Sequence, residues 1–395
     1  MQKLEKWQIS PHCILSCLYF LLLPTTIAIN SAGNSILKLA TIPIGLFFLV
    51  SLFLSNRKLQ INGVHLSLLA FTFSAISTLF LNPSSDSISN VIGYALNAAL
   101  YVCISVIPYN KAELDLMEKV QIVLLVVLNA LTLLSNGTED DRTTLMIMGQ
   151  TSDPNFFVGF FIFPLTVALK RLASGKHRIL YLLLIAVSIY TIFLSGSRGG
   201  LLAVAVTIAG FALLYPSDFA TRMIVLDGGI ALLFVLWILL KPVLPEKIVA
   251  RMSFAEVVES GGTGRMEIWK SMLREIVDQP DKLLLGRGVN ARHGMFVGGM
   301  WDNVVAHNQI LQTAYNQGLV GVLSFFALVG VSFFRCRKNR KAVSAAILGM
   351  MALSISLSFN QTTRSFWNLI AYAAFAFPDN DINTDNGGLS DHERA

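Results

Sequence analysis

Long runs of apolar residues, separated by short polar or basic segments, make up most of this 395-residue chain. A helix that crosses a bilayer needs about 20 predominantly apolar residues. On that criterion the sequence predicts about twelve transmembrane helices. They cover residues 14–29, 36–54, 64–81, 91–107, 116–135, 155–169, 179–194, 200–215, 223–240, 309–334, 343–359 and 366–377. The pattern therefore predicts an all-α polytopic membrane protein, built as a single membrane domain over residues 1–395.

One stretch, residues 241–306, interrupts this pattern, because its hydrophobicity falls and charged residues become frequent. We interpret it as one large extramembrane loop. The apolar residues that recur there at helical spacing are Trp269, Met272, Leu273 and Ile276. This spacing predicts an amphipathic helix over 264–278, with its apolar face against the membrane or the bundle. Thr263 is the expected N-cap, and Pro280 is expected to end the helix.

The charges of the short loops predict the orientation of the chain. The basic segments 56–58, 170–178 and 335–341 fall on one side if there are twelve spans, and excess Lys and Arg mark the cytoplasmic side. The loop at 241–306 then lies outside the cytoplasm, and both termini are cytoplasmic. The tail, 378–395, is polar and rich in Gly and Asp, which predicts disorder.

Composition supports the membrane class and excludes others. Charged residues make up 14% of the chain, whereas soluble domains carry roughly 25%. The net charge of +6 is explained by topology and does not point to nucleic acid. The four cysteines lie in or beside apolar runs and form no Cys-x-x-Cys pair, so neither a disulfide framework nor a zinc site is indicated.

Two arginines are candidates for binding an anion at the predicted outer face. Arg198 lies in a Gly- and Ser-rich turn between two apolar runs. An arginine at this depth is costly unless it is paired or faces a cavity. It therefore either clamps a phosphate with its guanidinium fork or reaches the interface or a buried carboxylate. Arg265 falls in the first turn of the loop helix, where N–H groups and the helix dipole favour an anion. A solvated arginine is the alternative there.

His307 opens the apolar run that follows the loop. With an ordinary pKa of about 6.5, a histidine can accept or deliver a proton, but a membrane histidine can also be only a structural hydrogen-bonding group. We expect Asp302 or Asn303 to cap the helix that begins there. Arg287, in a predicted tight turn between two glycines, and Arg364, in a predicted outer turn, are further candidate cations.

Acidic residues on the predicted outer side have two interpretations. Asp153, followed by Pro154, predicts a capped helix N-terminus. The adjacent carboxylates of Glu139, Asp140 and Asp141 could bind a divalent ion or be only solvated. No His or Cys is placed to complete a transition-metal site.

The order of these motifs resembles a known family. They are an Asp-Pro-Asn triplet at 153–155, a Ser-Arg-Gly turn at 197–199, Gly-Arg-x-x-x-Trp at 264–269, the pair His307 and Asn308, and Gly-x-x-Gly at 318–321. In order and in membrane placement they resemble the bacterial O-antigen ligase and O-antigen polymerase superfamily. The resemblance covers roughly residues 153–321.

The resemblance implies a fold and a reaction. The fold would be a helical bundle similar to the metal-independent GT-C-like membrane glycosyltransferases, located in the bacterial inner membrane with its active site facing the periplasm. The reaction would move a glycan from undecaprenyl pyrophosphate to a sugar hydroxyl of an acceptor glycolipid. That acceptor is lipid A–core for ligases and another lipid-linked repeat unit for polymerases. No metal or cofactor is expected; membrane lipids and a chain-length regulator are expected partners, and nucleic acid is not.

The resemblance also implies roles for individual residues. Arg198 and Arg265 would stabilise the departing pyrophosphate, and His307 would orient or deprotonate the attacking hydroxyl. These three are the expected catalytic residues of a single displacement with inversion at the anomeric carbon. The side chains expected to bind pyrophosphate or glycan are those of Arg198, Arg265, Arg287, Arg364 and Asn308.

Three functions remain open at this point. We favour a polymerase over a ligase, because basic and acidic residues nearly balance in the large loop and leave no basic surface for a phosphate-rich core acceptor. A lipid-linked polysaccharide transporter is the alternative from another class. Transporters often show related halves and broken mid-membrane helices, whereas this sequence shows no related halves and gathers its polar residues on one face. A non-catalytic assembly partner is the third.

Overall fold

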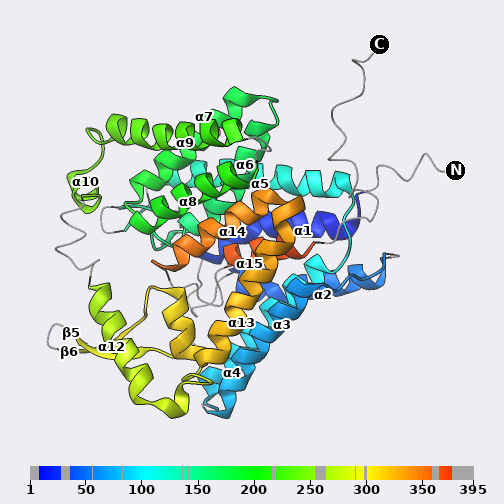
Figure 1. The fold of residues 1–395 in the computed structure, drawn as a ribbon. Helices are drawn as coiled ribbons and strands as arrows, with labels where there is room; N and C mark the ends of the chain where they lie inside the picture. Colours follow the sequence, from blue (N-terminus) through cyan, green and yellow to red (C-terminus); the bar gives the residue numbers. More distant parts are fainter. Residues whose placement is uncertain are drawn as a thin grey trace.

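The computed structural model describes residues 9–27, 36–55, 57–81, 83–135, 137–139, 142–215, 219–253, 264–289, 291–297, 300–357 and 364–375. Helices dominate it (Figure 1). The predicted tail at 378–395 and the carboxylates of Asp140 and Asp141 lie outside the described residues, as does Thr263.

Each predicted span coincides with a helix. The helices are α1 (Pro11–Leu22) continued by η2 (Leu23–Ile27), α2 (Ile36–Phe53), α3 (Gly63–Ser77) continued by η3 (Thr78–Phe80), α4 (Ser85–Ser105), α5 (Lys111–Leu134), α6 (Val158–Ala173), α7 (Arg178–Leu194), α8 (Arg198–Leu214), α9 (Phe219–Leu240), α13 (Gln309–Asn339), α14 (Lys341–Ser354) and α15 (Arg364–Ala374). Among the described residues, α3 with η3, α4, α5 and α13 are long and apolar enough to cross a membrane, and six further apolar helices are shorter. The helical membrane architecture is confirmed at this level, and a full set of twelve spans stays a prediction.

The segment between α9 and α13 contains more structure than the sequence predicted. It includes α10 (Glu246–Arg251), α12 (Arg265–Asp278), η4 (Pro280–Lys282) and a hairpin of β5 (His293–Val297) with β6 (Met300–Val304). Helix α12 confirms the predicted amphipathic helix, although Gly264 occupies its N-cap position. Its buried face consists of Met272 and Ile276, which pack against the start of α13. The loop therefore folds back onto the membrane helix that follows it.

Short strands correct the all-α expectation. Besides β5 and β6, two small antiparallel pairs precede α6: β1 (Thr138–Glu139) with β2 (Arg142–Thr143), and β3 (Met146–Ile147) with β4 (Gln150–Thr151). A second correction concerns the start of α13. Asp302 and Asn303 lie within β6, and the N-cap is Asn308, whose side chain accepts a hydrogen bond from the backbone N–H of Leu311 at 3.0 Å.

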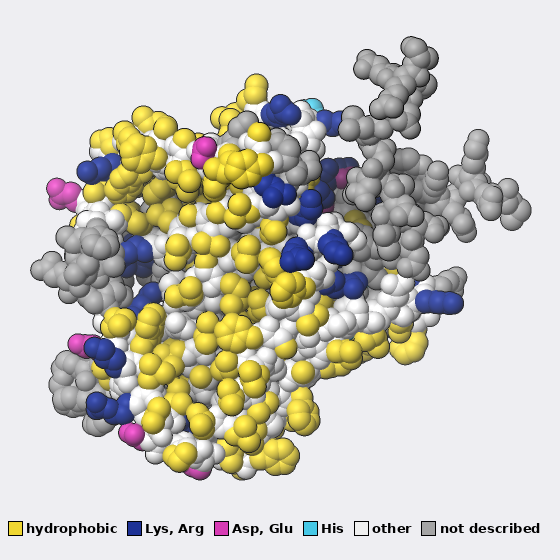
Figure 2. Space-filling model, in the orientation of Figure 1, with side chains coloured by type: hydrophobic (Ala, Val, Ile, Leu, Met, Phe, Trp, Pro, Cys, Tyr) yellow, Lys and Arg dark blue, Asp and Glu magenta, His cyan; other side chains and the backbone are white. Residues whose placement is uncertain are grey.

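Helix α15 forms the centre of the bundle, and every described residue from Arg364 to Phe375 is buried. It packs against α3, α4, α6, α13 and α14. The outer helices instead expose apolar side chains, for example Phe47 of α2 at 62% and Leu323 of α13 at 61%. Apolar side chains cover much of the face shown in Figure 2. A surface of this kind needs a lipid environment, because soluble proteins rarely expose apolar patches this large.

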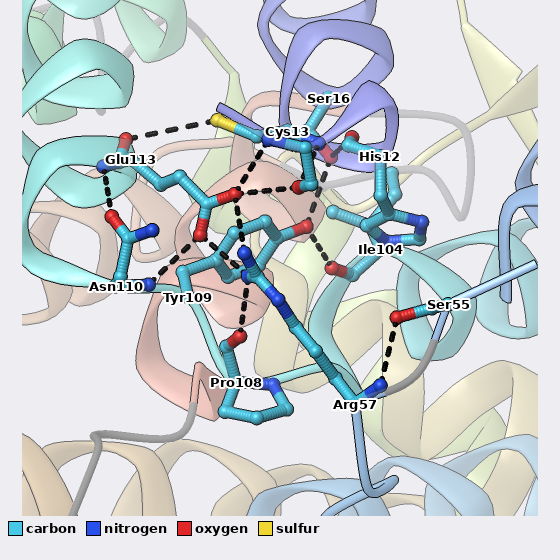
Figure 3. Close-up of polar contacts among 11 residues, drawn as sticks. His12, Cys13, Ser16, Ser55, Arg57, Ile104, Pro108, Tyr109, Asn110 and Glu113 are labelled. Carbon is cyan, nitrogen blue, oxygen red and sulfur yellow. Dashed lines mark hydrogen bonds and ion pairs between the residues drawn. The ribbon is translucent and has the colours of Figure 1, made fainter. Parts of the chain in front are cut away.

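A buried carboxylate joins the first helices (Figure 3). Glu113, in the first turn of α5, has no exposed surface and forms an ion pair with Arg57 at 2.5 Å. It also accepts hydrogen bonds from both the backbone N–H and the hydroxyl of Ser10, the residue that caps α1. Removing one partner of such a pair typically costs about 3–5 kcal/mol. This cluster fixes the ends of α1 and α5 against the segment that precedes α3.

Helix α13 is broken at Gly318, whose φ of 63° and ψ of −159° are not helical. The chain after η4 fills the break: the backbone N–H groups of Arg287 and Gly288 donate to the carbonyls of Tyr315 and Asn316, and the carbonyl of Leu283 accepts from the N–H of Leu319. The backbone groups of α13 that the break leaves without helical partners are therefore hydrogen-bonded to the large loop, which holds the first half of α13 in place. This break explains the first glycine of the Gly-x-x-Gly sequence at 318–321.

Candidate active site

Arg265 occupies the first position of α12 and is partly buried. Burial lowers the pKa of its guanidinium, as do the charges of Arg198 and Arg251, whereas the carboxylate of Asp153 raises it. These interactions place the four charged groups near one another, although they come from α12, α8, α10 and the turn before α6. The two expected catalytic arginines, Arg198 and Arg265, are thus brought together.

The turn that carries Arg198 is held by hydrogen bonds. Ser197 caps α8 by accepting from the backbone N–H of Gly200 at 3.0 Å, and its hydroxyl donates to Oδ1 of Asn155 at 2.9 Å. Arg142 donates to the same Asn155 oxygen at 3.3 Å and, through Nε, to the carbonyl of Ser195 at 2.7 Å. The start of α8 is thereby fixed against the segment before α6.

Asp153 stabilises that segment in a way that the sequence indicated only in part. Its Oδ1 accepts hydrogen bonds from the backbone N–H groups of Asn155 and Phe156 at 2.7 and 3.2 Å. Helix α6 itself begins later, at Val158, and Phe157 at its N-cap makes no side-chain capping bond. Asp153 therefore shapes the turn and supplies the negative charge that Arg265 and His307 experience.

His307 lies within electrostatic range of Arg265 and Asp153. Burial lowers the pKa of its imidazole, the charge of Arg265 lowers it further, and Asp153 opposes both. Its backbone has a φ of 46°, in the left-handed region that residues with a side chain rarely adopt. Such strain persists only where the surroundings impose it. The lowered pKa favours the neutral form of this imidazole.

Trp269 and Gln312 impose the position of His307. Nε1 of Trp269 donates to the carbonyl of Ala306 at 2.7 Å, and the N–H of Ala306 donates to Oε1 of Gln312 at 2.8 Å. Trp269 follows Arg265 by four residues, so both lie on one face of α12. The Gly-Arg-x-x-x-Trp sequence therefore supplies two groups. The guanidinium of Arg265 acts on the imidazole through its charge, and the indole of Trp269 holds the carbonyl of the residue before His307.

Arg287 belongs to a different group of contacts. It forms an ion pair with Glu275 through Nε at 3.0 Å, and its guanidinium lies over the ring of Tyr315 at 4.5 Å. The hydroxyl of Tyr315 and Nδ1 of His293 also contact the Glu275 carboxylate. Burial raises the pKa of Glu275, but these hydrogen bonds and the charge of Arg287 lower it by more. The structure thus places Arg287 in a network that supports α12 and the first half of α13.

Of the other two candidates, Arg364 lies apart from His307 in its contacts, whereas Asn308 adjoins His307 in the chain. Arg364 begins α15 and donates to the hydroxyls of Tyr19 and Thr41, from α1 and α2. Asn308 caps α13 next to His307. No hydrogen bond or ion pair within the described part of the chain joins Arg364 to Arg198, Arg265 or His307.

Sequence reasoning missed three residues of this region: Arg251, Arg142 and Asn155 as a hydrogen-bonding centre. Arg251 ends the short helix α10, and its charge acts on Arg265. Neither arginine is part of a spaced motif, so only the folded arrangement reveals it. In Figure 2, Lys and Arg side chains lie between α10 and α12, on the left of the molecule. Within the described ranges, no three His, Cys, Asp or Glu side chains come together as a metal-binding group.

A comparison with protein families bears on the classes that the sequence left open. Residues 182–326 match the model of the O-antigen ligase family. This part of the chain is similar to that family. The resemblance to the O-antigen ligase and polymerase superfamily is therefore confirmed. No protein of curated function matches the chain significantly.

The matched region runs from α7 into α13 and includes Arg198, Arg251, Arg265 and His307. Asp153, which interacts with two of them, precedes it. The match supports an enzyme of the glycosyltransferase type that acts on a lipid-linked glycan and a lipid acceptor, in a multi-pass membrane protein.

Proposed function

We propose that this protein is an inner-membrane glycan polymerase that transfers an O-antigen-type oligosaccharide from undecaprenyl pyrophosphate to a sugar hydroxyl of a second lipid-linked unit, at the periplasmic face. The observation that carries the proposal is the group of charges that acts on Arg265, namely Arg198, Arg251 and Asp153, together with His307, on which Arg265 and Asp153 act in turn. Several guanidinium groups gathered at one place favour a ligand with more than one negative charge, and a pyrophosphate is such a ligand.

The arginines act on the leaving group. As the bond between the anomeric carbon and the pyrophosphate oxygen breaks, its electron pair stays on that oxygen and negative charge grows there. Preorganised cations stabilise this charge in a water-poor site, where a single such interaction is worth roughly 3–4 kcal/mol in enzymes studied by mutation. Arg198 and Arg265 fill this role, and Arg251 adds to the local positive field.

His307 acts on the acceptor. Because burial and Arg265 lower the pKa of its imidazole, the neutral form predominates at physiological pH and can accept a proton. The hydroxyl oxygen attacks the anomeric carbon while its proton moves to His307, and the products are a new glycosidic bond and undecaprenyl pyrophosphate. Attack from the side opposite to the pyrophosphate inverts the anomeric centre.

A ligase is the second candidate, because the family that matches residues 182–326 is described as an O-antigen ligase. The two functions differ in the acceptor alone, and the chemistry of the arginines and His307 serves both. The near balance of acidic and basic residues in the large loop favours the polymerase.

Transfer in vitro separates these functions. The purified full-length protein is given a defined undecaprenyl-pyrophosphate repeat unit, either alone or with lipid A–core. A polymerase forms chains of two or more repeats without lipid A–core. A ligase forms only modified lipid A–core. Movement of the lipid-linked glycan between leaflets without a new glycosidic bond would contradict both and support a transporter.

A further inference from the structure

Arg364 is a buried cation in the membrane bundle, and the side chains to which its guanidinium donates carry no charge. Its side chain is 4% exposed. Nη1 donates to the hydroxyl of Tyr19 at 2.9 Å and Nη2 to the hydroxyl of Thr41 at 2.6 Å. A hydroxyl of a third residue, Tyr101, donates to the carbonyl of Arg364 at 3.3 Å. Hydroxyls satisfy hydrogen bonds but leave the charge uncompensated.

Several other arginines of the described chain have their charge compensated by a carboxylate. Arg57 pairs with Glu113, Arg171 with Asp115 and Glu118, and Arg287 with Glu275. A charge buried without an opposite charge is costly, and ionisable residues within membrane bundles generally pair or line a ligand pathway. Since Arg364 makes no ion pair with any described carboxylate, an anionic ligand is the partner that its environment lacks.

A second observation comes from the neighbouring polar atoms. Asn368 follows Arg364 by four residues and so lies on the same face of α15. Its side chain is 3% exposed, and its Oδ1 has no hydrogen-bond partner among the described residues. Buried polar groups are nearly always paired. Because the oxygen and the N–H₂ of the amide can be exchanged by a flip, Asn368 can present its N–H₂ group to an acceptor such as a phosphate oxygen.

The position of this group points to a ligand from the membrane. Thr41 lies on α2, an outer helix whose neighbouring residues Ile42 and Leu46 are 60% and 58% exposed. The Arg364 guanidinium therefore lies one helix away from the lipid-facing surface. Lateral entry beside α2 would bring a lipid phosphate to it.

We propose that Arg364, Tyr19, Thr41 and Asn368 form a second phosphate-binding site, separate from the group around Arg265. It takes the phosphate group of a lipid that enters from the bilayer. The assignment of this phosphate to the lipid-linked acceptor rests on the proposed function. A transfer between two lipid-linked glycans needs two phosphate sites, one for the departing pyrophosphate and one that holds the acceptor.

Binding measured without turnover tests this site. The full-length protein is purified in a neutral detergent, and binding of undecaprenyl phosphate, inorganic phosphate and uncharged undecaprenol is measured directly together with thermal stability. An Arg198→Gln/Arg265→Gln double variant removes the first site. We expect this variant to retain one phosphate-binding site, and Arg364→Gln added to it to weaken that binding by at least about tenfold.

The matched control is Arg57→Gln, which removes a half-buried arginine whose charge is already paired. It is expected to lower thermal stability without changing phosphate binding. Arg364→Gln is expected to leave the unliganded protein as stable as before, or more stable, because an unpaired charge is removed. Arg364→Lys keeps the charge and is expected to recover part of the binding, which separates loss of charge from loss of folding.

The three probes identify the source of the phosphate. Tighter binding of undecaprenyl phosphate than of inorganic phosphate supports a lipid ligand, and equal binding of both overturns the lipid part of the proposal. Unchanged phosphate binding in Arg364→Gln overturns the site itself. Because no glycan transfer is measured, the site can be confirmed even if the proposed polymerase activity is absent.

Discussion

At the scale of single residues, His307 combines a strained backbone, burial and a neighbouring cation. The φ of 46° is imposed by the hydrogen bonds that Trp269 and Gln312 make to Ala306. Burial and the charge of Arg265 lower the pKa of the imidazole. The lowered pKa favours the neutral imidazole, and the strained backbone fixes its position. Both properties suit a residue that accepts a proton.

The pH dependence of transfer follows from this environment. A general base works when it is neutral, so activity is present above its pKa and is lost as the pH falls through it. The profile of kcat/KM reports the free enzyme, and because the pKa of His307 is lowered, its acidic limb is expected below pH 6.5. Bound pyrophosphate adds negative charge, so the limb of kcat is expected at higher pH. A kcat/KM limb above pH 7 would contradict this role.

Trp269→Phe tests whether the indole positions His307. The ring is kept but the hydrogen bond to the Ala306 carbonyl is lost. Small misplacements of a reacting group can reduce rates by up to about 100-fold, so we expect kcat to fall roughly 10- to 100-fold with KM nearly unchanged. Lys270→Ala, at the next and exposed position of α12, is the control. A rise in KM with unchanged kcat would assign Trp269 to substrate binding instead.

The residues that sequence reasoning found and missed differ in a physical way. Arg265 and Trp269 are four apart on one helix, so their common face could be predicted from spacing. Arg287 was expected near phosphate, but its partner Glu275 lies twelve residues earlier, on a face that is defined only by the return of the chain onto α12. Arg251 has no local pattern, because its relation to Arg265 exists only in the folded loop.

At the scale of elements, the break in α13 joins the large loop to the membrane helix. Gly286, with a φ of 77°, and Gly318, with a φ of 63°, let the two backbones approach closely. A Cβ at Gly286 would lie 2.3 Å from the carbonyl carbon of Asn316, and one at Gly318 would lie 2.4 Å from the carbonyl oxygen of Leu284. The first half of α13 depends on this contact. Asn308 caps that half, and His307 directly precedes the cap.

Gly286→Ala and Gly318→Ala are expected to destabilise the fold by about 2–5 kcal/mol each, since they add left-handed strain and overpacking. The control is Gly330→Ala, further along α13, where a Cβ meets no atom within 4 Å. That variant is expected to be neutral or to gain up to about 1 kcal/mol. Unfolding of the purified proteins in detergent measures the difference. Equal effects at the three positions would show that the interlocked backbones do not limit stability.

The elements themselves were predictable to different degrees. The helices of the bundle could be predicted from apolar runs, because a segment in lipid must satisfy its own backbone hydrogen bonds and expose apolar side chains. The early hairpins have strands of two residues, too short to leave an alternating pattern. The cap of α13 was wrong for a related reason: β6 extends through Asp302 and Asn303, which moves the helix start to Asn308.

At the scale of the whole molecule, the account depends on the orientation of the chain. Basic loops such as 170–178 are expected in the cytoplasm, and the loop with α12 in the periplasm. Lys176→Cys and Arg292→Cys place single thiols at exposed positions on the two predicted sides, in a chain whose four native cysteines have been replaced. A membrane-impermeant maleimide added to intact spheroplasts is expected to label Arg292→Cys alone. Labelling of Lys176→Cys alone would show the opposite topology, with the proposed active site on the cytoplasmic side.

The most direct measurement is the rate of glycan transfer in vitro by Arg265→Ala and Arg274→Ala, with undecaprenyl-pyrophosphate repeat unit as donor and a chelator present. Both arginines lie on α12, but Arg265 is partly buried beside Asp153, Arg198 and Arg251, whereas Arg274 is exposed. The account predicts that Arg265→Ala lowers kcat/KM by about 100-fold or more and that Arg274→Ala leaves it unchanged. Equal rates for the two variants would contradict the claim that these grouped guanidinium groups stabilise the departing pyrophosphate.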